Sequence, residues 1–455
     1  MQGLLTLLLV GSLLGTGQPA QSPTLVQAAK DADWRVVRIL LEEDTEVDET
    51  ASDGSTALHW ASYWDEVGVA ELLISRGANP SAANDLGATP LWSAGLNSSS
   101  SMVRLLLQAG ADPDAALLLG ETVLMTAARS GSADVVEQLL VAGANPNRAS
   151  AREQTALMWA AAQGHSDAVE LLLAHGAAVH VRTETWSELH KTDPAQASHP
   201  DYQMWVERGG NTALMFAIQS GDLSSTKLLV AAGANVNFES ASGVSATTLA
   251  AHADHDLLVE VLLENGADPN AEAGGYRALH AAILRGNKAS VEALLAYGAD
   301  PNAPLRAPTT TRRQSLDFFF HPVFVEATPF WLAARFVQPE IMRSLSSAGA
   351  DPFFTHDVEY WRGVPPDFLW EDEGPTTALM AAVGMGGRVT RGYTTPAPHE
   401  REVRALEAVR IAVELGLDLE AQNGNGRTAL EAAYNVRYDS IVDFLLENGA
   451  EDSLR

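Results

Sequence analysis

The chain contains no cysteine, which excludes disulfide bonds, thiolate metal sites, a cysteine nucleophile and lipidation on cysteine. It is also poor in basic residues: 29 lysines and arginines stand against 58 aspartates and glutamates, so the formal net charge is −29. Such a charge argues against nucleic acid or an anionic membrane face as the partner. No apolar run reaches the roughly 20 residues that a bilayer-spanning helix needs, so we expect no integral membrane span.

What the chain does contain is enough apolar material for a core. Hydrophobic residues make up 46% of its 455 residues, which rules out wholesale disorder. The length suits either two or three ordinary domains or one long repeat array.

The N-terminus carries a short apolar run over residues 4–14, followed by the small residues Gly15, Gly17 and Ala20. This arrangement is typical of a secretory signal peptide. We therefore expect residues 1–20 to be a signal peptide and the protein to be exported, to the periplasm or the extracellular space. No lysine or arginine precedes the run, so a cytoplasmic chain with an uncleaved apolar N-terminus, or a buried first helix, stays open.

A short pattern of the form Thr-x-Leu-x-x-Ala recurs along the chain, and its early copies are spaced by 33 residues. A degenerate first copy begins at Pro23. The later copies begin at Thr56, Thr89, Thr122, Thr155, Thr212, Ser245, Arg277, Thr328, Thr377 and Thr428.

Most copies carry a second landmark, a Gly-Ala-Asn/Asp sequence that is usually followed by proline. We expect the threonine to cap a first helix, and the glycine to end a second helix in the left-handed conformation. Apolar pairs such as Val135 and Val136 put one stripe on one face of that second helix. The glycines of this landmark are Gly77, Gly110, Gly143, Gly233, Gly266 and Gly298.

These two landmarks resemble the ankyrin-repeat family, whose unit reads D-x-x-G-x-T-P-L-H-x-A-A-x-x-G-H and ends in G-A-D-x-N. About eleven units cover residues 23–455, and with the apolar N-terminus the chain resembles exported ankyrin-repeat proteins of the bacterial type. The resemblance implies an all-α solenoid of stacked helix pairs with short β-hairpin loops. It also implies a non-enzymatic protein–protein interaction module, such as a scaffold, inhibitor or protector, that is monomeric and needs no cofactor.

Four insertions break the regular spacing, at about 182–210, 304–327, 352–375 and 384–402. They hold about half of the phenylalanine, tryptophan and tyrosine residues of the chain. One interpretation is that each insertion packs on the adjacent solenoid surface. The other is that neighbouring insertions form a lip that grips a partner, because aromatic residues dominate binding hot spots.

No common catalytic motif is present: there is no H-E-x-x-H, no Walker loop and no G-x-S-x-G. The best metal-like cluster joins His252, Asp254, His255 and Asp256, but His255 occupies the framework position of the G-H dipeptide in the repeat. We therefore predict no catalytic residue and no metal.

The competing hypothesis is a metal- or small-molecule-binding protein, or an enzyme, with a site built from the insertions. Its candidate residues are His321, His356 and the acidic residues around Glu371.

In the family, partners usually lie in the concave groove made by the hairpin tips and the ends of the first helices. The excess acidic charge favours a basic protein partner there. The corresponding positions are Tyr63, Trp64, Arg129, Gln163, Gln219, Arg285, Arg335 and Phe336. From the insertions, the aromatic candidates are Trp205, Phe320 and Trp361.

Other large residues of the motif are predicted to be core. Trp60, Trp159 and Phe216 occupy a position that packs between units in the family. Four methionines that replace the motif histidine are expected to fill space rather than bind a ligand. They are Met125, Met158, Met215 and Met380.

Overall fold

The computed structural model divides into two compact bodies. We call them the N-terminal body, Met1–Leu118, and the C-terminal body, Leu119–Arg455. Within the part of the chain that the structure describes, no helix has the length and apolar character needed to cross a membrane. The described residues are 24–43, 45–191, 203–272, 274–307, 320, 322–357, 374–386 and 398–452.

Several predictions from the sequence concern residues outside these ranges. They are the predicted signal peptide (1–20), the binding candidate Trp361, and the metal or catalytic candidates His321 and Glu371.

The described residues of the N-terminal body form helix pairs in two layers. The first helices contact one another in sequence order, and so do the second helices. The first helices are α1 (Leu25–Lys30), α3 (Ala57–Tyr63) and α5 (Pro90–Leu96). The second helices are α2 (Trp34–Glu42), α4 (Val67–Ser75) and α6 (Ser100–Gln108).

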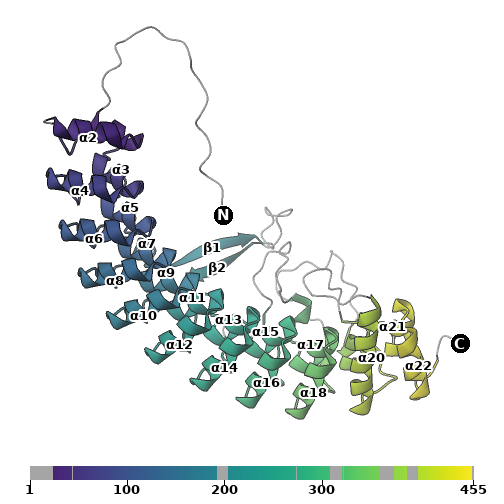
Figure 1. Cartoon of the computed structure of the whole chain (residues 1–455). Helices are drawn as coiled ribbons and strands as arrows, with labels where there is room; N and C mark the ends of the chain where they lie inside the picture. Colours follow the sequence, from purple (N-terminus) through teal and green to yellow (C-terminus); the bar gives the residue numbers. More distant parts are fainter. Residues whose placement is uncertain are drawn as a thin grey trace, which may run out of the picture. The chain divides into compact units, whose positions relative to one another are not determined.

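The C-terminal body repeats this arrangement, with each helix contacting the next helix of its own layer (Figure 1). The first helices are α7 (Val123–Ser130), α9 (Ala156–Gln163), α11 (Ala213–Ser220), α13 (Ala246–His252), α15 (Ala278–Arg285), α17 (Pro329–Arg335), α19 (Ala378–Ala382) and α21 (Ala429–Val436). The second helices are α8 (Ala133–Val141), α10 (Ser166–Ala174), α12 (Leu223–Ala231), α14 (Asp256–Glu264), α16 (Lys288–Ala296), α18 (Pro339–Ser347), α20 (Pro398–Glu414) and α22 (Asp439–Glu447). The predicted all-α fold of stacked helix pairs is confirmed.

The two sequence landmarks begin and end the helices as predicted. Thr122 precedes α7, and its hydroxyl oxygen accepts the backbone N–H of Met125 at 3.2 Å. At the end of α8, Gly143 takes a φ of 96°, and the next N–H, of Ala144, bonds to the carbonyl of Leu139 at 2.9 Å. A positive φ here favours glycine, because a β-carbon would strain the turn.

The core lies between the two layers and is filled as expected. The stripe that includes Val135 and Val136 on α8 is fully buried. The four methionines at the motif histidine position are also buried, which confirms their prediction as filling residues: Met125, Met158, Met215 and Met380.

The large aromatic residues one position further along are only half-buried, so their prediction as core is wrong in part. They are Trp60, Trp159 and Phe216. At the two tryptophans, the ring lies against a cation instead of only apolar neighbours. The ammonium of Lys30 lies 5.4 Å from the ring centroid of Trp60, and the guanidinium of Arg129 lies 5.3 Å from that of Trp159.

Neighbouring units of the C-terminal body are joined by a repeated asparagine clamp. The side chain of Asn302 donates to the carbonyl of Gly349 at 3.1 Å and accepts the N–H of Asp351 at 2.7 Å. This clamp links residues on either side of the insertion at 304–327, so the insertion leaves the contact between neighbouring units intact. Asn147, Asn237 and Asn270 make the same pair of bonds at three other places.

The insertion at 182–210 forms an antiparallel hairpin of β1 (Thr185–Lys191) and β2 (Gln203–Gly209). It leaves the C-terminal body on the side of the first helices (Figure 1). At its base, the N–H of Thr183 donates to the carbonyl of Asn211 at 3.0 Å.

The described part of the insertion at 304–327 packs inward, whereas that of the insertion at 352–375 buries His356 but leaves Phe353 exposed. A short 3-10 helix, Pro322–Phe324, lies in the insertion at 304–327. The ends of the insertion at 352–375 are closed by the pairing of β3 (Thr355–His356) with β4 (Thr376–Thr377). The described residues therefore favour packing for the insertion at 304–327 and projection for the hairpin.

Candidate functional site

The predicted binding positions fall on the C-terminal ends of the first helices. In the N-terminal body, Tyr63 ends α3 and Trp64 is its C-cap. In the C-terminal body, the predicted residues lie in the last turns of five first helices, and each first helix contacts the next one along the chain. We call these residues the end row: Arg129 on α7, Gln163 on α9, Gln219 on α11, Arg285 on α15 and Arg335 on α17.

The end of α3 presents two exposed aromatic rings at right angles. The centroids of Tyr63 and Trp64 lie 5.2 Å apart, with an interplanar angle of 82°, and each residue is 48% exposed. Trp60 packs edge-on against Tyr63 at 5.9 Å. The indole N–H of Trp64 donates to the carbonyl of Lys30 at 3.4 Å, and the amide of Asn97 donates to the carbonyl of Tyr63 at 2.7 Å. The Trp64 ring is thus bonded to the preceding helix pair, and the backbone of Tyr63 to the following one.

Two arginines of the end row already have partners within the chain. Arg129 pairs with Glu121 at 3.2 Å, and Arg285 pairs with Asp254 at 3.7 Å. A cation in the last turn of a helix also opposes the negative end of the helix dipole. These arginines therefore stabilise the ends of their own helices, whereas Gln163 and Gln219 between them are exposed.

At α17 the end row is less accessible. Arg335 and Phe336 are half-buried, and the ring of Phe336 packs edge-on against Phe324 with 5.5 Å between centroids. Phe324 itself is fully buried. This part of the row is supported by the insertion at 304–327.

The expectation that the ring of Phe320 lies on the binding surface is wrong. Phe320 has no exposed surface, and its ring lies 5.9 Å from the ring of Tyr276 and 6.3 Å from that of His280. Burial also raises the pKa of the Tyr276 phenol. A run of apolar aromatic residues gains more free energy by filling a core than by facing water, and this position shows that outcome.

The hairpin presents a different aromatic group. Trp205 is 69% exposed and pairs across the strands with Leu189, which is also exposed. On the other face of the hairpin, the guanidinium of Arg152 lies 5.8 Å from the ring of Trp186. The predicted candidate Trp205 is therefore accessible.

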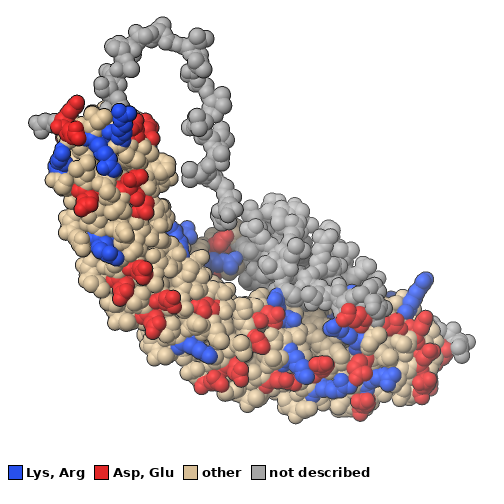
Figure 2. Space-filling model, viewed as in Figure 1, with Lys and Arg blue, Asp and Glu red and all other residues tan. Residues whose placement is uncertain are grey.

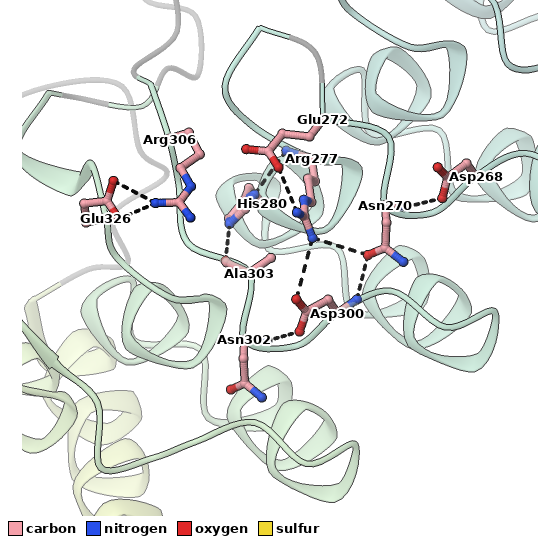
Figure 3. Close-up of polar contacts among 10 residues, drawn as sticks. All are labelled: Asp268, Asn270, Glu272, Arg277, His280, Asp300, Asn302, Ala303, Arg306 and Glu326. Atoms are coloured by element: carbon pink, nitrogen blue, oxygen red, sulfur yellow. Dashed lines mark hydrogen bonds and ion pairs between the residues drawn. The ribbon is translucent and has the colours of Figure 1, made fainter.

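A polar cluster that the sequence reasoning missed surrounds Arg277 (Figure 3). Its guanidinium pairs with Glu272 at 2.8 Å and with Asp300 at 3.7 Å. The Nδ1 atom of His280 accepts the backbone N–H of Arg277 at 3.1 Å. Burial lowers the pKa of His280 to about 4. The sequence contained a signal for this cluster, because arginine replaces the motif threonine at position 277. In the structure, Arg277 is the cation that pairs with the carboxylates of Glu272 and Asp300.

The residues proposed for metal binding or catalysis have structural roles where they are described. Within the described residues, no three histidine, aspartate or glutamate side chains are grouped so that they could hold a metal ion. Asp254 accepts from the side chain of Asn287 at 2.8 Å, and His255 is the N-cap of α14.

His356, from the competing hypothesis, is fully buried. Its Nε2 lies 2.9 Å from the carbonyl of Val325, and its ring stacks on Trp331 with 4.4 Å between centroids. Burial lowers the pKa of His356. The surroundings of this ring are those of a framework residue.

Two exposed leucines at hairpin tips of the N-terminal body were also missed. Leu86 is 66% and Leu118 is 75% exposed, and the N–H of Leu118 donates to the carbonyl of Leu86 at 3.1 Å. Turn tips are ordinarily polar, so a leucine in the turn sequence Asp85-Leu86-Gly87 could have indicated an exposed apolar residue.

Comparisons with known proteins agree with the repeat pattern. A family model described as "Ankyrin repeats (3 copies)" matches residues 25–116, 114–183 and 214–304, which is more than half of the chain. Among solved structures, the chain is similar to the crystal structure of the human ASB11 ankyrin repeat domain. The identity is 25%, the TM-score is 0.44, and the match covers 55% of this chain and 100% of that chain. No curated protein matches the sequence.

Proposed function

The chain belongs to the ankyrin-repeat family, and on that premise we propose that it binds another protein as a scaffold, inhibitor or protector and catalyses no reaction. Ankyrin repeats are generally protein–protein interaction modules, and repeat stacks offer extended surfaces for such contacts. The proposed contact surface comprises the hairpin tips, the ends of the first helices and the β1–β2 hairpin.

One observation carries this proposal: a constant frame presents side chains that vary from unit to unit. The last turns of α3, α9 and α11 carry Tyr63, Gln163 and Gln219, all exposed. The helices beneath them use the same threonine caps and the same buried alanine and leucine positions. A rigid framework of similar helices that carries different exposed side chains is typical of a recognition surface.

The β1–β2 hairpin supports the same surface in the C-terminal body. It emerges on the side of the first helices (Figure 1), and its exposed Trp205 is a large aromatic ring of the kind that dominates binding energetics. We propose that the same repeat unit continues to the end of the chain, about eleven units in all, with this insertion as an added contact.

The charge of the chain favours a basic partner. Figure 2 shows acidic side chains spread over the second helices of the C-terminal body, with basic ones among them. A net charge of −29 accelerates encounter with a cationic protein and opposes self-association, so we propose a monomer that binds a basic partner.

We also propose that the protein is exported, on the support of the apolar run at residues 4–14 and the small residues that follow it. Intact mass and N-terminal sequencing of the purified chain test this. A mature N-terminus near Gln18 or Gln21 is expected, and an unprocessed chain would overturn export by this route.

The binding function is tested by cross-linking the full-length chain in cells and identifying what it captures. The double variant Gln163→Lys/Gln219→Lys places two cations on the end row and is expected to lose a basic partner. Leu257→Lys, at an exposed position of the second helix α14, is the matched control and should retain it. Retention by the end-row variant together with loss from the control would overturn the proposed surface.

A further inference from the structure

We infer that the corner between Tyr63 and Trp64 binds a cationic side chain, a lysine or an arginine, of the partner. This rests on the proposed function for the existence of a partner, and adds the chemistry of one contact and its place in the N-terminal body. Both residues of the corner are about half exposed, and helices α1 and α3 end beside it.

The geometry is that of a two-walled aromatic site. The two rings meet at 82° with 5.2 Å between their centroids, and about half of each residue is exposed. The Trp64 indole donates to the carbonyl of Lys30, and the Tyr63 ring packs edge-on against Trp60, so both rings have contacts before any ligand arrives. A pre-organised site loses less conformational entropy on binding.

The electrostatics at the base favour a cation. Helices α1 and α3 both end at this place, and the negative ends of their dipoles point toward it. The last turn of α3 contains no basic residue, whereas the last turn of α1 contains Lys30, whose ammonium lies over Trp60. The carboxylates of Asp31, the C-cap of α1, and Asp65, which follows Trp64, are both exposed. An apolar ligand would meet these charges without compensating them.

The chain itself shows that its aromatic rings hold cations. Next to the corner, the ammonium of Lys30 lies 5.4 Å from the ring of Trp60, within the range of a cation–π contact. In the C-terminal body, Arg129 lies over the ring of Trp159 and also pairs with Glu121. This contact therefore combines three groups: a cation, an aromatic ring and a carboxylate. The Tyr63–Trp64 corner offers two of these groups, rings and carboxylates, at an exposed place.

The test uses the full chain labelled with 5-fluorotryptophan, with the Trp64 resonance assigned from Trp64→Phe. Fluorine NMR then follows a titration with n-butylammonium chloride and with tetramethylammonium chloride, against sodium chloride at equal ionic strength and n-butanol as the neutral analogue. The expected result is a saturable shift of the Trp64 resonance with the organic cations and not with the two controls.

Variants locate the effect. Tyr63→Ala should weaken the apparent affinity for the cations about two- to fivefold, the range of an exposed cation–aromatic contact. Asp31→Asn/Asp65→Asn should weaken it as well. Tyr297→Ala removes an equally exposed ring from the second-helix layer and should change nothing.

Equal shifts with n-butanol, or unchanged affinity in Tyr63→Ala, would overturn the inference. Partner capture with the end-row variant is scored separately. Capture that depends on Gln163 and Gln219, combined with no cation response at Trp64, would leave the proposed function in place and remove only this contact.

Discussion

The imidazole of His280 reaches Ala303 of the following segment, with its Nε2 2.9 Å from the carbonyl oxygen. Its Nδ1 accepts the backbone N–H of Arg277 at 3.1 Å, so the neutral ring donates at one nitrogen and accepts at the other. Protonation would place a second proton where the backbone N–H already donates. His59 makes the same pair of bonds in the N-terminal body, to Thr56 and Ala88.

Stability should therefore fall in mild acid. Burial lowers the pKa of His280 to about 4 from its ordinary 6.5. Below pH 6.5 the unfolded chain takes up a proton that the folded chain does not bind until about pH 4, so the free energy of unfolding decreases over this interval, by at most about 3 kcal/mol for this residue. Burial also lowers the pKa of His59 and of His356, which adds to the loss.

Urea denaturation at several pH values between 7.5 and 4.5 checks this prediction. His280→Asn should be less stable than the parent near neutrality but lose less stability on acidification. His175→Asn, at an exposed ring, is the control. An equally steep pH dependence in His280→Asn would show that this imidazole does not contribute to the acid response.

Loss of one asparagine clamp should loosen the contact between two units. Asn302→Ala removes the bonds to Gly349 and Asp351, and we expect a cost of about 1–2 kcal/mol. Hydrogen exchange at the Asp351 amide should accelerate. Asn265→Ala is the matched control, because its side chain bonds to Val261 of its own helix. Unchanged exchange at Asp351 in Asn302→Ala would contradict the proposed role of the clamp.

Truncation to alanine should affect stability differently at a buried and at an exposed phenylalanine. Phe320→Ala removes a fully buried ring and should destabilise the C-terminal body by about 3–5 kcal/mol. Phe353→Ala removes a ring that is 62% exposed and should change stability by less than about 0.5 kcal/mol. Thermal unfolding compares the two variants, and a similar melting temperature for both would mean that Phe320 does not contribute to the core.

The Arg277 cluster should be sensitive to salt. Arg277→Met leaves Glu272 and Asp300 near each other without their cation (Figure 3), and we expect a loss of about 1–2 kcal/mol. Arg306→Met, whose pair with Glu326 is largely exposed, should cost less than about 1 kcal/mol. The difference between the variants should shrink at about 0.5 M salt, because screening weakens the repulsion of the remaining carboxylates. A cost independent of salt would point to lost packing instead.

The frame of the fold was predictable because each landmark acts locally. A threonine hydroxyl caps the helix that it precedes, as Thr122 does, and a glycine such as Gly143 turns the chain directly after its helix. The buried stripe of α8 follows from helical periodicity alone. These effects depend on a few neighbouring residues, so sequence reasoning captures them.

The candidate surface was less predictable, because exposure depends on distant neighbours. Phe320 was grouped with Trp205 as an insertion aromatic, but Tyr276 and His280 cover the first, while the hairpin register leaves the second open. The corner of Tyr63 and Trp64 depends on α1, because the carbonyl of Lys30 accepts from the Trp64 indole and the Lys30 ammonium lies over Trp60. Sequence periodicity could place these residues on helix ends but not identify what packs against them.

The most direct test of the protein-binding surface is site-specific photo-cross-linking in the full chain. A benzoylphenylalanine is placed either at Gln219, at the end of the first helix α11, or at Leu257, exposed on the second helix α14. The account predicts a partner adduct on irradiation from position 219 and none from position 257. An adduct from position 257 alone would contradict it.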